Sequence, residues 1–314
     1  MSASAVDERI RSLRPPKPYV DPFKAHGSLI EDERRPDGET ERALTAFLAG
    51  AECPFTCAFC DLWRWTIDGP TPPGALTRQL AAVIPALDGS RPDRIKLYNA
   101  SNFFDQRAVP EEDQVGIARL VGDFAAVTVE SHANTIGPKV LDFSRQIGGR
   151  LEVAIGLETI HPRAMENLNK RLDLARFDSA ARFLADNGID LRVFVLLGAP
   201  YVPAEKCVEW TVRSVKYAVE RGASIVSIIP VRGGNGEMER LQSAGEFVPP
   251  TLSQLEETID RCWEFRDSVV TADLWDIERL PACDNCRNQR VERLARLNIA
   301  GGVQPSVICD QCAR

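Results

Sequence analysis

The sequence predicts an α/β protein built around a parallel sheet, either an incomplete barrel of six strand–helix units or an open doubly wound sheet. Short apolar runs alternate along the chain with segments whose apolar residues recur every three or four positions. Successive runs begin about 25 to 50 residues apart, the length of one strand–helix unit. Polar residues also gather directly after the apolar runs, where parallel strands of either architecture carry their chemistry.

Six apolar runs are predicted to be strands. The segments between them have helical spacing, such as Leu174 to Leu184, which ends at the helix-terminating pair Asn187-Gly188. A further helix follows the last strand, and Ser253 with Glu256 is its predicted capping box. The predicted strands are Leu44–Leu48, Arg94–Tyr98, Val127–Glu130, Leu151–Leu157, Leu191–Leu197 and Ile225–Ile229.

The chain divides into four predicted regions. Residues 1–42 are polar and interrupted by prolines, so we expect an extended N-terminal arm. Residues 43–240 contain the six strands and form the predicted catalytic core. A helical extension over residues 241–280 follows, and residues 281–314 form a cysteine-rich tail.

The composition limits the class of partner. The 314 residues include 38 basic and 45 acidic side chains, a net charge of −7, so the surface as a whole lacks the positive field of a general nucleic-acid binder. No apolar run approaches the roughly 18 residues of a membrane span, and the first residues lack the apolar stretch of a secretory signal. We therefore expect a cytoplasmic protein that does not contact a membrane.

Nine cysteines in such a chain indicate metal or redox chemistry, because the cytosol keeps thiols reduced. Cys207 and Cys262 stand alone within helical apolar patterns and are expected to be small core residues. The other seven fall into two tight groups. These are Cys53, Cys57 and Cys60 near the start, and Cys283, Cys286, Cys309 and Cys312 at the end.

The first group places three thiolates within eight residues, on a loop that leaves the first strand. Such a short loop can wrap three sulfurs around one compact metal centre but supplies no fourth ligand within reach. Structural zinc sites use four ligands, so three thiolates imply an open position. A 4Fe-4S cluster held by three cysteines likewise leaves one iron free to bind another group.

The second group consists of two Cys-x2-Cys pairs separated by 22 residues. Four thiolates close a tetrahedral shell, so a structural zinc is the simplest occupant, and an auxiliary iron–sulfur cluster uses the same ligands. The segment between the pairs is locally basic and is interpreted as a solvated helix face, with a phosphate-contacting patch as the alternative. Its basic residues are Arg287, Arg290, Arg293 and Arg296.

The Cys-x3-Cys-x2-Cys triplet, with the aromatic Phe59 before its last cysteine, resembles the radical S-adenosylmethionine (SAM) superfamily. That resemblance implies a partial (βα)6 TIM-like barrel, here with an N-terminal arm and a small C-terminal knuckle of four cysteines. It also implies that Cys53, Cys57 and Cys60 ligate a 4Fe-4S cluster whose fourth iron chelates SAM. One electron, from a donor such as a flavodoxin or ferredoxin, then cleaves SAM to methionine and a 5′-deoxyadenosyl radical that abstracts hydrogen from the substrate.

The same resemblance implies contacts to SAM at the strand ends. Phe59 matches the aromatic residue near the adenine, and Asn99-Ala100-Ser101 stands where many relatives carry Gly-Gly-Glu, without the acidic residue. Glu158 matches a carboxylate that accepts hydrogen bonds from SAM, and Lys170 matches a cation that contacts the SAM carboxylate. The implied cofactor-binding residues are Phe59, Asn99, Ser101, Glu158, Lys170 and Gly198. The catalytic residues stay unassigned.

Histidine at the end of the third strand is a further candidate. Glu130-Ser131-His132 is placed to face the substrate, where His132 is either a general base or a surface histidine.

The segments at the strand ends resemble most the radical SAM subunit of archaeosine synthase and related oxidoreductases. The likeness is carried by Tyr98–Asp105, Val129–Ser131 and Glu152–Glu158 and spans roughly residues 44 to 240. It implies a modified guanine in tRNA as substrate and tRNA as a partner. Two alternatives stay open: a radical SAM enzyme that acts on a small molecule or peptide with an auxiliary cluster in the tail, and a noncatalytic zinc-knuckle interaction protein.

Overall fold

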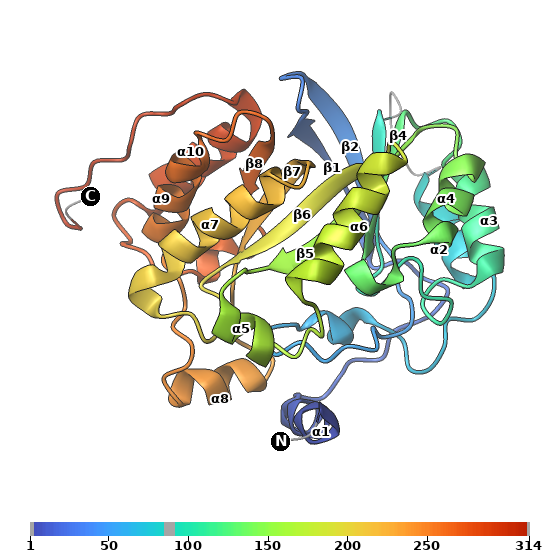
Figure 1. Cartoon of the computed structure of the whole chain (residues 1–314), viewed down its shortest axis with the longest axis horizontal. Helices are drawn as coiled ribbons and strands as arrows, with labels where there is room; N and C mark the ends of the chain where they lie inside the picture. The colour runs from blue at the N-terminus through green and yellow to red at the C-terminus, as the bar shows by residue number, and fades with distance from the viewer. Residues whose placement is uncertain (1–2, 85–91, 313–314) are drawn as a thin grey trace.

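The computed structural model describes residues 3–84 and 92–312, which fold around one eight-stranded sheet that curls into a half-barrel (Figure 1). The strands lie in the sheet in the order in which they occur in the chain. Strands β2 to β8 run parallel, and β1 pairs antiparallel with β2. A doubly wound sheet reverses its strand order at a switch point, so the sequential order excludes that alternative and confirms the partial barrel.

The six predicted strands are all present as β2 to β7. Two further strands flank them. The strand β1 lies in the N-terminal arm and β8 in the helical extension. The strand β1 is mostly exposed and polar, which explains why no apolar run marked it. The strands are β1 (Gly27–Arg34), β2 (Thr40–Phe47), β3 (Arg94–Tyr98), β4 (Ala126–Ser131), β5 (Arg150–Glu158), β6 (Asp190–Leu197), β7 (Ala223–Pro230) and β8 (Val269–Ala272).

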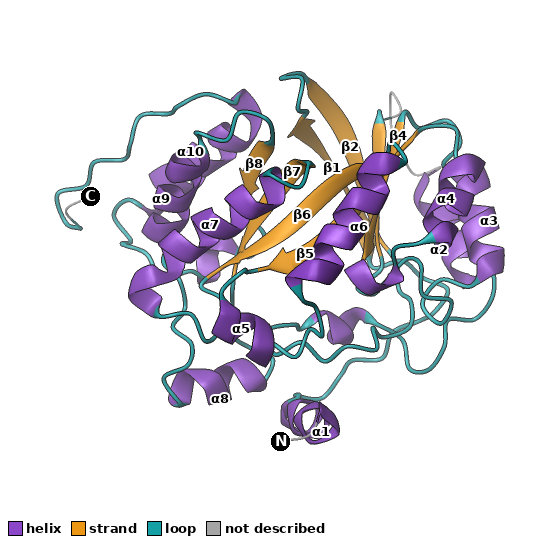
Figure 2. Ribbon diagram, in the orientation of Figure 1, coloured by secondary structure: helices purple, strands orange, loops and turns teal. Residues whose placement is uncertain are grey.

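Helices cover the outer face of the half-barrel (Figure 2). The covering helices are α2 (Ala75–Val83), α3 (Glu111–Leu120), α4 (Pro138–Gln146), α6 (Leu174–Asp186), α7 (Cys207–Val219), α9 (Leu252–Cys262) and α10 (Arg287–Ala300). Those from α2 to α9 lie in the connections between parallel neighbours, which are right-handed in nearly all proteins, whereas α10 follows the last strand, β8, and contacts β8 and β1. Three others lie at the end of the barrel drawn lowest in Figure 1: α1 (Ala3–Leu13), α5 (Pro162–Asn167) and α8 (Glu237–Ser243). Among the described residues, no helix combines the length and the apolar character needed to cross a bilayer.

The predicted end of the helix α6 is confirmed, and the predicted capping box of α9 is wrong. The helix α6 ends as predicted, with Asn187 as its C-cap and Gly188 at a left-handed φ of 66°. The capping box of α9 lies two residues earlier than predicted, at Thr251 and Gln254. Ser253 and Glu256 therefore do not form it, because Glu256 is turned inward and pairs with two arginines of α10.

The main core lies between the outer face of the sheet and the covering helices. Strand residues such as Val127, Val153 and Val193 are fully buried there, and each such side chain stabilises the fold by about 1.5 to 3 kcal/mol. Cys207 and Cys262 belong to this core, as predicted. A second, smaller apolar cluster lies at the carboxyl ends of the strands and joins α1, the triplet loop and α8. Its buried members are Ile10, Ala58, Leu196, Ala199, Val231, Met238, Leu241 and Phe247.

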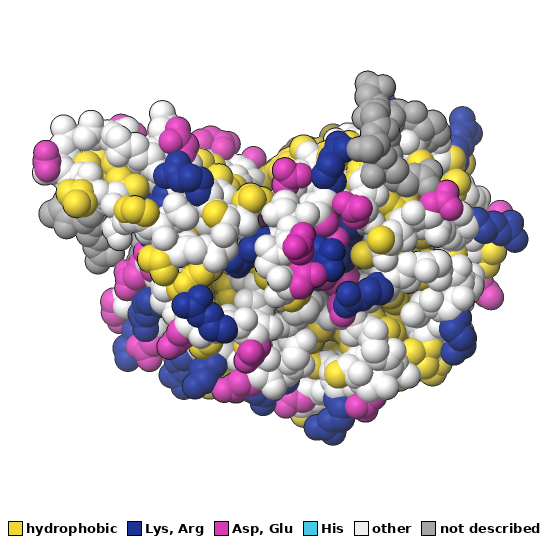
Figure 3. Space-filling view, turned by 90° about the horizontal axis from the view of Figure 1, so that it is seen from above, with side chains coloured by type: hydrophobic (Ala, Val, Ile, Leu, Met, Phe, Trp, Pro, Cys, Tyr) yellow, Lys and Arg dark blue, Asp and Glu magenta, His cyan; other side chains and the backbone are white. Residues whose placement is uncertain are grey.

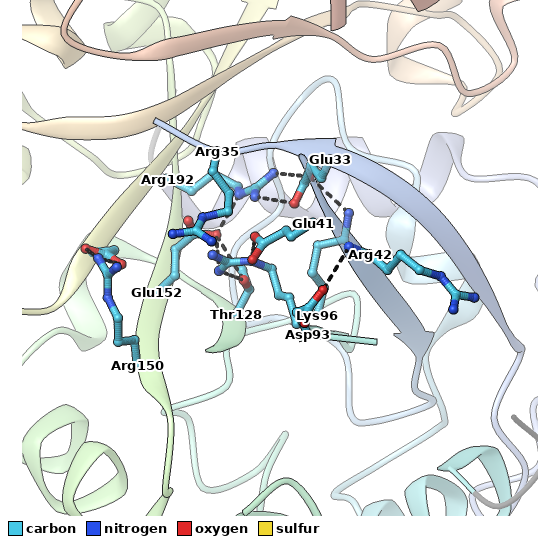
Figure 4. Close-up of polar contacts among 12 residues, drawn as sticks. Glu33, Arg35, Glu41, Arg42, Asp93, Lys96, Thr128, Arg150, Glu152 and Arg192 are labelled. Atoms are coloured by element: carbon cyan, nitrogen blue, oxygen red, sulfur yellow. Dashed lines mark hydrogen bonds and ion pairs between the residues drawn. The ribbon is translucent and has the colours of Figure 1, made fainter. Parts of the chain in front are cut away.

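A network of charged side chains fills the interior near the amino ends of the strands (Figure 4). Arg192 on β6 donates two hydrogen bonds, of 2.8 and 2.9 Å, to the carboxylate of Glu33 on β1 and a third, of 2.8 Å, to Glu152 on β5. Because β1 and β6 are far apart in the sheet order, this contact crosses the concave side of the half-barrel. We call this network the barrel floor; its members are Glu33, Glu41, Arg94, Lys96, Thr128, Glu152 and Arg192.

The barrel floor is paired throughout. Arg94 binds Glu41, and Lys96 binds both Glu31, at 2.7 Å, and Glu33. Burial raises the pKa of the Glu33 carboxyl, but Arg192 and Lys96 outweigh this effect and hold that pKa well below its ordinary value. Acidic and basic side chains also interleave near the middle of the face opposite α1 and α8 (Figure 3).

Candidate functional site

The cysteine triplet lies on the loop that leaves β2, at the carboxyl edge of the sheet. Burial raises the pKa of the Cys57 thiol to about 12, and nearby Cys53 and Glu158 add to this effect whereas Lys170 opposes it. The pKa of Cys60 is also raised, mainly by burial. A bound cation reverses this preference, because a thiol that coordinates a metal loses its proton. The thiols are therefore expected to lose their protons when a positively charged ligand binds.

Side chains from other strand ends hold the triplet loop in place. Asn102, after β3, donates to the Cys53 sulfur at 3.4 Å. Asn235, after β7, is buried and donates to the carbonyl oxygens of Ala58 and Cys60 at 2.8 and 3.1 Å. Neither asparagine was identified from the sequence as a contact of the triplet, because no local pattern links a strand end to a loop so distant in the chain.

The cysteine triplet is a less compact group than the tail cysteines among the residues that the structure describes. Over residues 3–84 and 92–312, the one group of cysteine, histidine and acidic residues that is compact enough for a single ion lies in the tail. A multi-iron cluster spaces its ligands more widely than an ion does, since each cysteine binds a different iron. Three cysteines on one short loop suit such a cluster.

The turn after β3 carries unpartnered polar side chains. Asn99 is 1% exposed, and neither its Oδ1 nor its Nδ2 has a hydrogen-bond partner; the Oγ of Ser101 is buried in the same way. An unsatisfied buried polar group costs about 1 to 3 kcal/mol, so most such groups in folded proteins are paired. Asn102, in the same turn, contacts Cys53. The turn that carries these unpartnered atoms therefore also contacts the triplet.

Glu130, at the end of β4, holds this turn. Its carboxylate accepts the backbone N–H of Asn99 at 2.9 Å and also those of Ala100 and Ser101. Burial raises the pKa of the Glu130 carboxyl to about 7, although the three amides act in the opposite direction. Because the carboxylate binds the backbone, the side chains of Asn99 and Ser101 stay available to a ligand. Glu130 thus supports the turn, whereas the sequence suggested that it faces the substrate.

Glu158 and Lys170 form a close ion pair of 2.6 Å at the end of β5. A side chain at Gly156 would collide with both groups, so the glycine makes the space that the pair fills. Burial lowers the pKa of Lys170, but Glu158 and Cys57 outweigh this effect and raise it, which keeps the ammonium charged. The structure thus brings together two residues that the sequence placed at one site, next to the cysteine triplet.

Backbone strain gathers at this end of the barrel. The described non-glycine residues with a positive φ all follow the carboxyl end of a strand or the short helix after it. Such residues cost on the order of 1 kcal/mol each and cluster at functional sites. They are Ala100, Glu158, Asn169, Arg171, Tyr201 and Asp276. We call this end of the barrel, formed by the loops over residues 48–61, 99–105, 159–173 and 231–236, the barrel mouth.

His132 is neither a surface residue nor placed as a general base. It is 5% exposed, and its ring stacks on Phe55 with 4.2 Å between ring centres. Its Nδ1 accepts the backbone N–H of Asn134, which leaves Nε2–H to donate to the carbonyl oxygen of Lys170 at 3.0 Å. Burial and the charge of Lys170 lower its pKa to about 3. His132 is a neutral support of the loop that carries Lys170.

The two remaining predicted contacts lie at the barrel mouth in different surroundings. Phe59 is half-buried and packs against the smaller apolar cluster. Gly198 follows β6 with a left-handed φ of 73°, and a Cβ there would lie 2.8 Å from Pro250. The glycine is therefore required by the packing of Pro250, whatever else its backbone contacts.

The four tail cysteines form a compact group at the start of α10. Their sulfurs all lie within 4.8 Å of one another, with Cys283 and Cys309 at 4.0 Å and Cys286 and Cys312 at 3.7 Å. Backbone N–H groups and the side chain of Asn285 lower the pKa of Cys309 to about 6. The group thus has the shape of a closed four-ligand site.

The basic helix between the two cysteine pairs is not the solvated face that we expected. Arg290 and Arg293 are 5% and 2% exposed. Arg290 donates to the sulfurs of Cys286 and Cys312 at 3.1 and 3.6 Å and pairs with Glu256. The phosphate-contacting alternative fails for the same two residues, because their guanidinium groups are used inside the protein. Arg290 offsets negative charge at the tail sulfurs, whereas Arg293 binds Glu256 and Asp260.

The half-barrel fold of this chain is similar to that of a solved radical SAM enzyme. The radical SAM methyltransferase from Sphaerobacter thermophilus superposes with a TM-score of 0.53 at 15% identity, covering 79% of this chain and 73% of that one. The radical SAM fold implied by the triplet is therefore confirmed.

The curated relatives are more distant. Archaeosine synthase subunit beta from Methanosarcina acetivorans is 23% identical over 234 residues, 71% of this chain and 67% of that protein. An uncharacterised protein of Methanocaldococcus jannaschii is 21% identical over 171 residues, 52% of this chain and 47% of that protein. The chain thus spans about half the length of the latter. No family model matches the chain.

Proposed function

We propose that this protein is a radical SAM enzyme that binds a 4Fe-4S cluster through Cys53, Cys57 and Cys60 and SAM beside it. The observation that carries the proposal is the convergence of three features at the barrel mouth. Three cysteines share one loop at the carboxyl edge of the sheet, the polar atoms of Asn99 and Ser101 are buried without partners, and the neighbouring backbone is strained.

The donor set fits both groups. Three thiolates suit an iron–sulfur cluster and leave one iron for another ligand. The Glu158–Lys170 pair offers a negative and a positive group 2.6 Å apart, which complements the ammonium and carboxylate groups of the methionine part of SAM. Asn99 and Ser101 supply uncommitted hydrogen-bonding atoms, and Phe59 and Gly198 line the same end of the barrel.

When bound, the cluster supplies the electron that cleaves SAM to methionine and a 5′-deoxyadenosyl radical. The protein's own residues prepare the site for it. Lys170 lowers the pKa of Cys57 and Cys53 and so favours the thiolates that the iron requires. Glu130 fixes the turn that presents Asn99 and Ser101, and the paired barrel floor closes the opposite end of the barrel to water.

Anaerobic reconstitution tests the proposal. The protein is loaded with iron and sulfide, reduced with dithionite in place of the expected flavodoxin or ferredoxin, and given SAM. We expect 5′-deoxyadenosine from the parent and, in Cys57→Ala, a loss on the order of a thousandfold. Cys207→Ala, which removes a core cysteine outside the mouth, is the matched control and retains the product. Equal product from Cys57→Ala and the parent would contradict the proposal.

We further propose a nucleobase in tRNA as the substrate. A curated relative is named as a subunit of archaeosine synthase, and the strand-end segments resemble the radical SAM subunit of that enzyme. We expect a tRNA affinity that falls steeply between about 50 and 200 mM salt, as phosphate contacts require. Formation of 5′-deoxyadenosine without tRNA binding at low salt would favour the alternative, a small molecule or peptide. A noncatalytic zinc-knuckle protein would give no SAM cleavage at all.

We infer that the tail holds a single zinc ion. Zinc–sulfur bonds of about 2.3 Å in a tetrahedron place the sulfurs roughly 3.8 Å apart, close to the 3.7 and 4.0 Å of the two tail pairs. Metal analysis of the reconstituted protein tests this inference. We expect about four iron atoms and about one zinc per chain. About eight iron atoms without zinc would instead indicate an auxiliary cluster, the feature that the small-molecule alternative requires.

A further inference from the structure

The helix α1 lies at the barrel mouth and contacts two of its loops and the helix α8. It belongs to the N-terminal arm, far in the sequence from the strands whose ends it meets, and Figure 1 shows it at the same end of the barrel as α5 and α8. Ile10 is 3% exposed and packs in the smaller apolar cluster with Ala58 of the triplet loop. Arg9 pairs at 2.9 Å with Glu237 of α8, whose side chain is completely buried. The helix is therefore a fixed part of the mouth.

Asp7 is the residue of α1 that reaches both cofactor loops. Its Oδ1 accepts hydrogen bonds from the hydroxyl of Thr56, next to Cys57, and from the Nδ2 of Asn169, at 2.8 Å. Its other oxygen pairs with Arg171. Asn169 also donates to the carbonyl oxygen of Thr56 at 2.9 Å, so the two loops meet at this carboxylate.

Two partners of Asp7 have a backbone conformation that depends on their surroundings. Asn169 and Arg171 both adopt a positive φ, of 55° and 57°, and Lys170 lies between them. Such a conformation persists only where the surroundings enforce it. The two hydrogen bonds and the ion pair of Asp7 supply that enforcement, and charge-assisted hydrogen bonds are stronger than neutral ones.

We propose that Asp7 is a positioning residue that clamps the triplet loop to the loop over residues 169–171. The clamp sets the placement of Cys57 relative to Lys170, and thus the fit of the cluster and SAM; the role of these two loops rests on the proposed function. The N-terminal arm is on this basis part of the cofactor site, although it lies outside the six strand–helix units.

Alkylation of the iron-free protein tests the clamp without using activity. The full-length chain, with its tail metal in place, is treated with iodoacetamide and the modified cysteines are followed by peptide mass spectrometry. We expect the triplet of Asp7→Ala to be alkylated at least about tenfold faster than that of the parent, because loss of even one of the charge-assisted contacts of Asp7 corresponds to about that factor. Glu8→Ala, on the exposed side of the same helix, is the matched control and keeps the parent rate.

Cys207 and Cys262 serve as internal reporters of global opening, because both are buried in the main core. Triplet rates in Asp7→Ala that equal those of the parent would overturn the proposal. If Cys207 and Cys262 also react faster, the variant has loosened throughout, and the isosteric Asp7→Asn then decides. A selective increase at the triplet in that variant supports the clamp, and no increase overturns it.

The affinity for SAM separates the clamp from the proposed function. After reconstitution we expect Asp7→Ala to hold the same amount of iron as the parent but to bind SAM about tenfold more weakly. If the parent takes up iron but does not cleave SAM, the proposed function is contradicted. The alkylation rates would still test the clamp in that case. If Asp7→Ala binds SAM as tightly as the parent does, the proposed effect of the clamp on the cofactor site is contradicted.

Discussion

The two ends of the barrel treat buried polar groups in opposite ways. At the barrel floor, Arg192 satisfies two carboxylates, and each charge has a partner within the network (Figure 4). At the barrel mouth, the side-chain amide of Asn99 and the hydroxyl oxygen of Ser101 are also buried but lack partners, and the backbone around them is strained. Both ends are polar interiors of one sheet, so polarity alone does not distinguish structure from function.

The difference teaches that satisfaction of hydrogen bonds marks the role of a buried polar group. A paired network stabilises a fold, whereas unpaired atoms lower its stability and persist where a ligand is to complete them. In barrels of parallel strands the carboxyl ends carry the chemistry and the amino ends the stability. The predictions below test whether the two ends of this barrel divide the work in that way.

The largest expected effect is at the barrel floor. Arg192→Met leaves Glu33 and Glu152 without their shared cation, and breaking a buried ion pair from one side costs about 3 to 5 kcal/mol. Arg150→Met is the matched control, because Arg150 pairs with Asp190 at the surface with its side chain 71% exposed and should cost less than about 1 kcal/mol. Urea unfolding measures both. Equal costs would break the distinction between floor and surface.

The second effect is a loss of folding stability at acid pH. Because Arg192 and Lys96 hold the pKa of Glu33 below its ordinary value, the stability that this carboxylate contributes is complete above pH of about 4.5 and is lost as the pH falls further. Between about pH 7 and pH 3 we expect the parent to lose about 2 kcal/mol more than Glu33→Gln does. Urea unfolding at both pH values checks this, with Glu39→Gln, an exposed glutamate, as control. A constant difference between parent and Glu33→Gln would contradict the pairing.

The smallest effect compares two hydroxyl groups. Thr128 at the floor donates to Glu152 at 2.9 Å and accepts from Arg94 at 3.0 Å, so Thr128→Val should cost about 1.5 kcal/mol of unfolding free energy. Ser101→Ala at the mouth removes an unpartnered hydroxyl and should leave the unfolding free energy unchanged or slightly raised.

In SAM binding we expect the opposite ranking of these two variants from that in unfolding free energy. We expect Ser101→Ala to weaken SAM binding about tenfold in the reconstituted protein, and Thr128→Val to leave it unchanged. Equilibrium dialysis with labelled SAM measures both. A destabilised Ser101→Ala with parental affinity would place Ser101 among the structural residues and remove one support of the proposed site.

Local sequence patterns predicted the sheet well because strands and helices follow periodicity over a few residues. All six predicted strands are present, and the cysteine groups lie where their spacing placed them. The strand β1 escaped prediction, since its exposed polar side chains give no apolar run. It supplies Glu33 to the floor and Glu31 as a further partner of Lys96. Arg290 and Arg293 were misjudged for a related reason, because a charged residue in a helix is usually solvated and only its distant partner, Glu256, shows otherwise.

By itself the sequence determined the order of strands and helices, the two cysteine groups and the chemistry that three or four clustered thiolates allow. Those properties depend on neighbours within a few positions. Only the tertiary structure decided which polar groups are paired, that Glu130 supports a turn and that Asp7 joins two loops. Asp7 and Asn169 are 162 positions apart in the chain, and a hydrogen bond between them exists only because the curled sheet brings its strand ends to one edge.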